Sequence, residues 1–98
     1  MRSGYSVEQV FIRPRGGQYS FTFVLVAPSG ALLRDSITLH SSNLKQAISM
    51  ASRYLFAKGF IDEVRGLRLR VERAGTLHDD ANLKAQFIRA FETLVEPP

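Results

Sequence analysis

The chain alternates apolar and polar residues most regularly between Tyr19 and Val26. One side of this segment carries Tyr19, Phe21, Phe23 and Leu25. Because successive side chains of a β-strand point to opposite faces, the pattern predicts a strand with one buried face. The other side also becomes apolar at its end, with Val24 and Val26, and this favours a central position in a sheet.

Three further segments have the composition or alternation of strands: Glu8–Arg13, Leu32–His40 and Val64–Arg73. The turns "PRGG" and "APSGA" separate the first three strands, and Gly75 ends the fourth. In the third strand the inward residues are Leu33, Ile37 and Leu39, and the outward residues are Arg34, Ser36, Thr38 and His40. Asp35 shares the inward side, so we expect it at the edge of the core.

Two segments have helical spacing of apolar residues. The first follows "SSNLKQ", where Asn43 can cap the helix and Gln46 can complete a capping box, and Gly59 closes it. The second begins at "HDDANLK", where Asp79 or Asp80 can cap, and it ends before "EPP". Its expected buried residues are Leu83, Phe87, Ala90, Phe91 and Leu94.

The predicted order is therefore βββαβα in a single α+β domain over residues 1–98. We expect a two-layer sandwich in which two helices cover one face of a four-stranded mixed sheet. The handedness of parallel connections places the fourth strand beside the first, at the sheet edge, in the spatial order 3-2-1-4.

This order resembles the opening portion of the ribonuclease-H-like fold and the small antitoxin domains of the HicB type. Ribonuclease-H-like enzymes hold two metal ions with carboxylates, one of which lies on the first strand. Here the first strand has "VFIR" and the first helix has "NLKQAISMASRYLFAK", with no acid in either segment. The resemblance therefore does not extend to the catalytic residues, and no family is assigned.

The amino-acid composition excludes several kinds of chemistry and favours one class of partner. The chain has no cysteine, which excludes disulfides and thiolate chemistry, and its net charge of +4 favours acidic partners. His40 and His78 lie far apart in sequence, and helix capping accounts for the serines and aspartates beside them. We expect no catalytic site, metal or cofactor. The N-terminal "MRSGYSVEQ" lacks the apolar run of a secretion signal, so we expect a cytoplasmic protein without membrane contact.

The main functional hypothesis is nucleic-acid binding through Arg13, Arg15, Arg34, Arg68 and Arg70. In "VRGLRLRVER" leucine and valine alternate with Arg68 and Arg70, which predicts a strand with a basic outer face. Arg13 and Arg15 flank the first hairpin turn. Guanidinium groups and neighbouring hydroxyls are suitable donors to phosphates. The alternative is structural: the arginines are the wet side of a half-buried strand, or they protect a sheet edge from unwanted pairing.

The competing hypothesis is protein association. Met50, Tyr54 and Phe56 exceed the apolar surface that one buried helical stripe requires. Surplus apolar surface on a small domain is typical of an interface, and a symmetric homodimer is a simple way to bury it. An acidic protein partner, or an accessory or inhibitor role without nucleic-acid contact, belongs to the same class.

Overall fold

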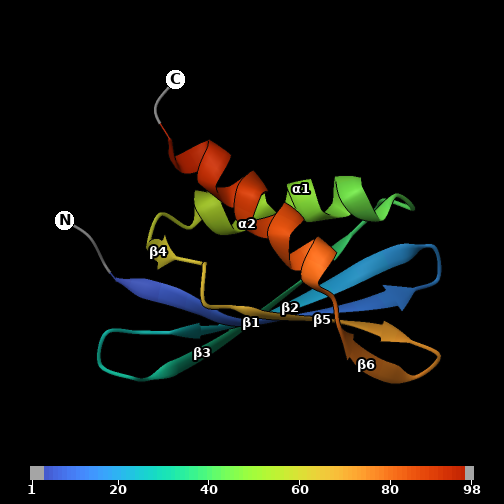
Figure 1. The fold of residues 1–98 in the computed structure, drawn as a ribbon, viewed down its shortest axis with the longest axis horizontal. Helices are drawn as coiled ribbons and strands as arrows, with labels where there is room; N and C mark the ends of the chain where they lie inside the picture. The colour runs from blue at the N-terminus through green and yellow to red at the C-terminus, as the bar shows by residue number, and fades with distance from the viewer. Residues whose placement is uncertain (1–3, 97–98) are drawn as a thin grey trace.

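The computed structural model describes residues 4–96 of the chain. The elements are, in order, β1 (Tyr5–Arg15), β2 (Gln18–Val26), β3 (Leu32–Leu39), α1 (Leu44–Ala57), β4 (Ile61–Glu63), β5 (Arg68–Arg73), β6 (Thr76–Asp79) and α2 (Ala81–Val95). The strands form one mixed sheet, and both helices cover the same face of it (Figure 1). The predicted α+β architecture with two helices and a mixed sheet is confirmed.

The sheet differs from the prediction in its strands. It contains six strands in the order β3-β2-β1-β5-β6, with β4 paired to β1 outside this path. The predicted four-stranded sheet in the order 3-2-1-4 is therefore wrong. Strand β5 does pair in parallel with β1, but it is not an edge strand, because β6 turns back along its outer side. The two unpredicted strands have three and four residues, which is too short to show an alternating pattern.

The turn between β5 and β6 explains how a strand can follow Gly75 at once. Ala74 and Gly75 both have positive φ, at 52° and 80°. This combination is typical of the type I′ turn, whose twist matches that of the antiparallel strands it joins. The chain therefore reverses direction within two residues. Ala74 has a Cβ atom in this left-handed conformation, which costs about 1–2 kcal/mol.

The hydrophobic core lies between the sheet and the helices. Phe21 and Phe23 of β2 are completely buried there, and the ring of Phe23 lies 6.3 Å from that of Phe87 in α2. Helix α1 contributes Ala47, Ile48, Ala51 and Leu55 to the same core. The inward face predicted for β2 is thus the face that packs against the helices. Neither helix of residues 4–96 is long and apolar enough to cross a membrane.

The N-terminus of α1 is capped as predicted, but by a rearranged set of contacts. Asn43 accepts a hydrogen bond from the backbone N–H of Gln46 at 3.2 Å. The side chain of Gln46 does not return to Asn43. It accepts instead from the hydroxyl of Ser41, at 3.0 Å, and the same hydroxyl accepts the backbone N–H of Asn43.

Asp80, and not Asp79, caps α2. Its carboxylate accepts the backbone N–H of Leu83 at 3.0 Å and a hydrogen bond from Arg73 at 2.8 Å. These two bonds, the backbone one first, hold the pKa of Asp80 below its ordinary value. Asp79 lies in β6, where its side chain is free to take a different partner.

Asp35 fastens the edge strand β3 to the end of α1. Its carboxylate accepts hydrogen bonds from the Tyr54 hydroxyl at 2.7 Å and from the backbone N–H of Ser36 at 3.0 Å, and it pairs with Lys58 at 2.5 Å. Burial raises the pKa of Asp35, and the bonds from Lys58 and Tyr54 outweigh burial, so that the pKa is lowered. The inward position predicted for Asp35 therefore serves as a polar link between sheet and helix.

Candidate nucleic-acid interface

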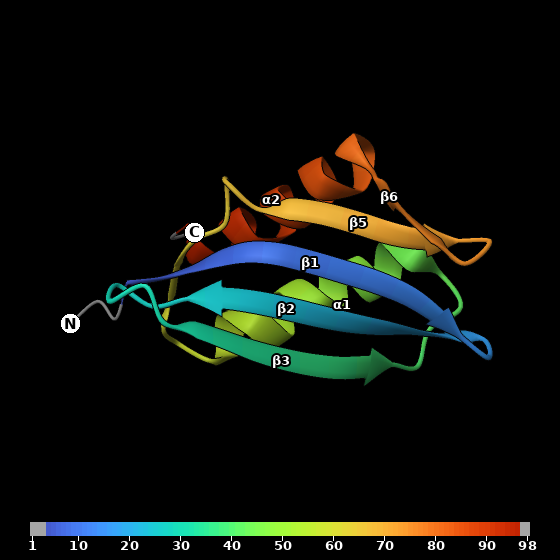
Figure 2. The same cartoon turned by 90° about the horizontal axis from the view of Figure 1, so that it is seen from below.

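The open face of the sheet is the side that the helices leave uncovered, as Figure 2 shows from below. Its side chains alternate with the core residues of each strand. The strand register arranges them in three rows: Arg34, Val24, Gln9 and Arg68; then Ser36, Thr22, Phe11, Arg70 and Asp79; then Thr38, Ser20 and Arg13. Arg15, at the end of β1, has the same parity as Arg13, so all five arginines singled out in the sequence share this face.

Phe11 lies at the centre of the open face. The guanidinium of Arg70 stands over its ring, with Cζ 4.7 Å from the centroid, and that of Arg13 lies 5.8 Å away. Arg70 also donates a hydrogen bond from Nη2 to Gln9 at 2.7 Å. Its Nε–H is buried and has no hydrogen-bond partner among residues 4–96. The geometry thus places a cation–π stack in the middle strands of the sheet.

Two of the arginines are paired with acids. Arg68 forms two hydrogen bonds with the carboxylate of Asp79, at 2.8 and 3.1 Å, and the hydrogen bond to Arg68 lowers the pKa of Asp79. Arg13 lies 3.3 Å from Glu72 of β5. Each pair joins neighbouring strands, so the acids of β5 and β6 offset part of the positive charge of this face.

Arg34 and Arg15 have no such partner. Within residues 4–96, neither forms an ion pair. Arg34 is exposed on the edge strand β3, and Arg15 is exposed where β1 enters the first hairpin turn. The β1–β2 and β5–β6 hairpins project from the same end of the sheet in both views (Figures 1 and 2). Arg15 is therefore at the end of the molecule that both turns share.

The hydroxyl groups of the open face lie beside the arginines. Ser20 and Thr22 belong to β2, and Ser36 and Thr38 to β3. Thr22 and Ser36 are hydrogen-bonded to each other at 3.1 Å. Val24 also lies on the open face but is only 5% exposed, so it adds little apolar surface there.

The three predicted interface residues of α1 lie in different environments. Met50 and Phe56 are exposed, at 36% and 43%. Phe56 contacts the ring of Phe91 in α2 edge-on, with centroids 6.1 Å apart. Tyr54 is half-buried, and its hydroxyl is already bonded to Asp35. The structure therefore brings Met50 and Phe56 to the surface and Tyr54 into an internal contact.

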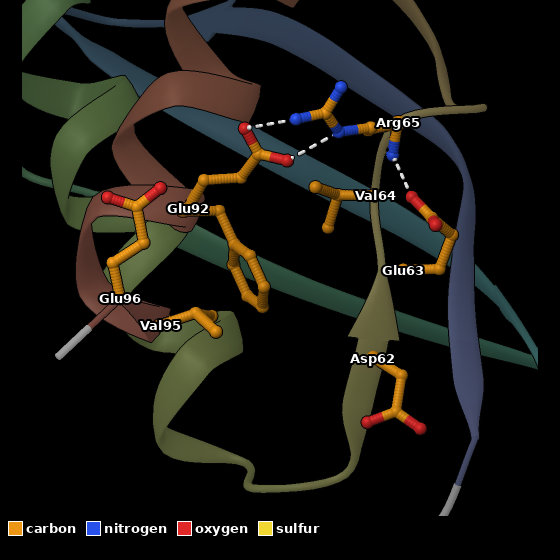
Figure 3. A pocket seen from close by; sticks show the side chains of 8 residues that line it. Asp62, Glu63, Val64, Arg65, Glu92, Val95 and Glu96 are labelled. Carbon is orange, nitrogen blue, oxygen red and sulfur yellow. Dashed lines mark hydrogen bonds and ion pairs between the residues drawn. The ribbon is translucent and has the colours of Figure 1, made fainter.

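A pocket of about 200 Å³ lies between β4 and the end of α2 (Figure 3). Phe91 and Val95 form part of its apolar lining. Its polar lining is mostly acidic, and Arg65 bonds Glu92 through Nε at 2.7 Å while its backbone N–H bonds Glu63. The charge of this pocket is unfavourable for a polyanion, so it does not extend the basic surface.

Sequence reasoning left two features of the surface unresolved. It did not decide whether Val10 or Phe11 lies on the open face, whereas the buried positions of Val10 and Ile12 require Phe11 to point outward. It also gave no indication that Lys45, Arg53 and Arg89 line one groove.

Within residues 4–96, no group of three or more histidine, aspartate or glutamate side chains is placed to hold a metal ion. No family model, curated protein or solved structure matches the chain.

Proposed function

We propose that this domain binds single-stranded nucleic acid on the open face of its sheet, without catalysis. The observation that carries the proposal is the stack of Arg70 on Phe11 at the centre of an uncovered, hydroxyl-bearing and arginine-bearing face. Single-stranded nucleic acid is bound in general by combining a stacking surface for bases with cations for the backbone. The open face has both components.

The stack of Arg70 on Phe11 suggests where the bases and the phosphates of the ligand would lie. One side of the Arg70 guanidinium covers the Phe11 ring, and a base can stack on its other side, since guanidinium planes and aromatic rings both serve as stacking surfaces. Phosphates would then run towards Arg34 and Arg13, which lie on either side of this centre. The half-buried ring of Phe11 also holds Arg70 in place before the ligand arrives.

The ion pairs of Arg68 and Arg13 are compatible with binding. Both pairs are between exposed or half-exposed side chains. Such pairs contribute about 0–1 kcal/mol each, so an arginine can exchange its carboxylate for a phosphate at small cost. The acids weaken binding by repulsion.

The test is fluorescence anisotropy of labelled oligothymidylate and oligouridylate at several salt concentrations. We expect wild-type binding to fall steeply with salt. Arg34→Gln should reduce the slope of log K against log[salt] by about 0.7, the value for one lost phosphate contact on a single strand. Phe11→Leu should weaken binding with an unchanged slope, because it removes stacking and no charge. Lys84→Gln is the charge-matched control. Absence of binding at low salt would refute the proposal.

Protein association is the second candidate, and the exposure of Met50 and Phe56 on α1 favours it. Exposed Val95 of α2 lines the pocket that also includes Phe91, the residue that Phe56 contacts. A homodimer that buries Met50, Phe56 and Val95 should dissociate in the variant Met50→Ser/Phe56→Ser. Sedimentation velocity of the wild type over a range of concentrations decides the matter, and a monomer at the highest concentration would exclude it.

A further inference from the structure

A second basic surface lies on the helical layer, on the opposite side of the molecule from the open face. It is a groove of about 390 Å³ between α1 and α2. Lys45 and Arg53 of α1 and Arg89 of α2 line it, and no acidic side chain of residues 4–96 does. The two helices bring these cations together although Lys45 and Arg89 are 44 residues apart in the sequence.

The cations of the groove are not ion-paired within residues 4–96, although Arg89 also lines a neighbouring pocket with Glu92 and Glu96. None of its three cations forms an ion pair with any residue of the described chain. Helix α1 contains no acidic residue, and α2 contains only Glu92, whose carboxylate is bound by Arg65. On the open face, by contrast, two arginines are held by carboxylates. All three cations of the groove therefore lack a carboxylate partner within residues 4–96, whereas on the open face only Arg34 and Arg15 have neither an ion pair nor a stacking partner.

We propose that this groove binds the phosphodiester backbone of a nucleic-acid strand, as a site separate from the open face. Cations, together with the polar side chains of Ser49 and Gln86, are the groups that contact phosphates in most complexes. The small side chain of Ala90 lets a backbone approach the groove closely. The choice of nucleic acid as the ligand rests on the proposed function. The observation that the cations of the groove form no ion pair within residues 4–96 is independent of it.

The lining favours a phosphodiester over an acidic protein segment. Protein interfaces depend on a few large anchors, usually aromatic residues or arginine in well-packed pockets. No aromatic side chain lines this groove, and its apolar residues are Ala90 and Leu94. Binding that relies on charge with little apolar anchoring is typical of a phosphate backbone. With a second site on the opposite face, one domain can hold two segments of single strand.

The test compares two triple variants of the full chain that each remove three positive charges. The groove variant is Lys45→Gln/Arg53→Gln/Arg89→Gln, and the sheet variant is Arg15→Gln/Arg34→Gln/Arg70→Gln. All six positions are at least partly exposed, and circular dichroism with thermal melting checks that both variants fold. Labelled oligothymidylate is titrated at several salt concentrations, and the stoichiometry is measured at low salt.

We expect the groove variant to lower the salt slope by about 2, three contacts at about 0.7 each, and to halve the number of strands bound. Wild-type slope and stoichiometry in the groove variant would overturn this inference and leave the proposed function intact. Loss of binding in the groove variant alone, with a wild-type sheet variant, would support the groove and refute the open face. Stronger competition by polyglutamate than by unlabelled oligothymidylate would overturn the choice of a phosphodiester.

Discussion

The open face of the sheet and the groove between the helices are both basic, but they differ in what surrounds their cations. On the open face Arg68 is held by Asp79, and Arg13 lies beside Glu72. In the groove Lys45, Arg53 and Arg89 have no carboxylate partner among residues 4–96. A count of arginines in the sequence ranks the open face first. The two acids of the open face, Glu72 and Asp79, remove that advantage in net charge.

The difference follows from the way each element brings residues together. Neighbouring strands place side chains opposite or diagonal to one another, so Arg68 of β5 can bond Asp79 of β6, which lies directly opposite Arg70. On a helix, partners must be three or four residues apart, and α1 offers no acid at any position. The open face is thus a mixed surface with a stacking centre, and the groove is purely cationic.

The largest effect is expected at Asp35, which links the sheet to α1 through Lys58 and Tyr54. Asp35→Asn should lower the free energy of unfolding by about 2 kcal/mol, since charge-assisted hydrogen bonds of partly buried groups contribute about 1.5–3 kcal/mol. Urea unfolding at neutral pH measures this change, with Glu8→Gln as a control that removes an exposed acid.

The pH dependence of the unfolding free energy tests the same contribution of Asp35. The pKa of Asp35 is lowered, so its stabilisation is present above the unfolded-state value of about 3.9 and is lost as pH falls through the lower folded value. The pKa of Lys58 is raised, chiefly by its hydrogen bond to Asp35, so the contribution of Lys58 is lost only as pH rises above about 10.4. The difference between wild type and Asp35→Asn should therefore vanish in acid. A difference that persists at pH 2 would contradict this assignment.

Removing the acids of the open face should make it resemble the groove. In Glu72→Gln/Asp79→Asn the affinity for labelled oligothymidylate should rise about tenfold at low salt, equivalent to about 1.4 kcal/mol. The gain should shrink at high salt, because exposed charges are screened. Anisotropy measures both values. An unchanged affinity would show that Arg68 and Arg13 do not face the ligand.

Adding an acid to the groove should have the opposite and smaller effect. Ser49 lies four residues after Lys45 and four before Arg53 on α1, so Ser49→Glu can pair with both. We expect the affinity for the same oligonucleotide to fall about threefold, equivalent to about 0.7 kcal/mol, while the helix becomes slightly more stable. The control Ser49→Gln introduces a side chain as large as glutamate but without its charge, and this variant should bind as the wild type does.

The smallest effect concerns the hairpin that holds Asp79 beside Arg68. The β1–β2 turn uses Gly16 and Gly17 at positive φ, but the β5–β6 turn uses Ala74 before Gly75. Ala74→Gly should raise the unfolding free energy by about 0.5 kcal/mol, since the relief of left-handed strain, about 1–2 kcal/mol, exceeds the stability lost to the greater chain entropy of glycine in the unfolded state, about 0.5–1 kcal/mol. Ala74→Val, whose branched side chain tolerates this conformation less well, should lower it. Thermal melting that ranks the two variants the other way would contradict the turn geometry.

The fold was predictable from the sequence where elements are long and periodic. The alternation of Phe21 with Thr22 and Phe23 indicates the buried face of β2, and Asn43 marks the start of α1. Strands β4 and β6 were not predictable, because they have only three and four residues and owe their pairing to neighbours. A strand after Ala74 depends on a turn conformation that alanine disfavours.

The candidate site was predictable only in part. The alternation in "VRGLRLRVER" places Arg68 and Arg70 on one face, and β5 is indeed extended there. The carboxylate beside Arg68 comes from β6, so it could not be inferred while that strand was unknown. The groove depends on how α1 packs beside α2, and periodicity within each helix does not give the relative rotation of two helices.

The most direct test of the proposed open-face site is an NMR titration of the ¹⁵N-labelled chain with oligothymidylate at low salt. We predict that the amide shifts of Phe11, Thr22 and Arg70 change together and saturate, and that the changes weaken in Arg70→Gln. If the amides of β1, β2 and β5 keep their shifts at saturating oligonucleotide, the open face does not bind single-stranded nucleic acid.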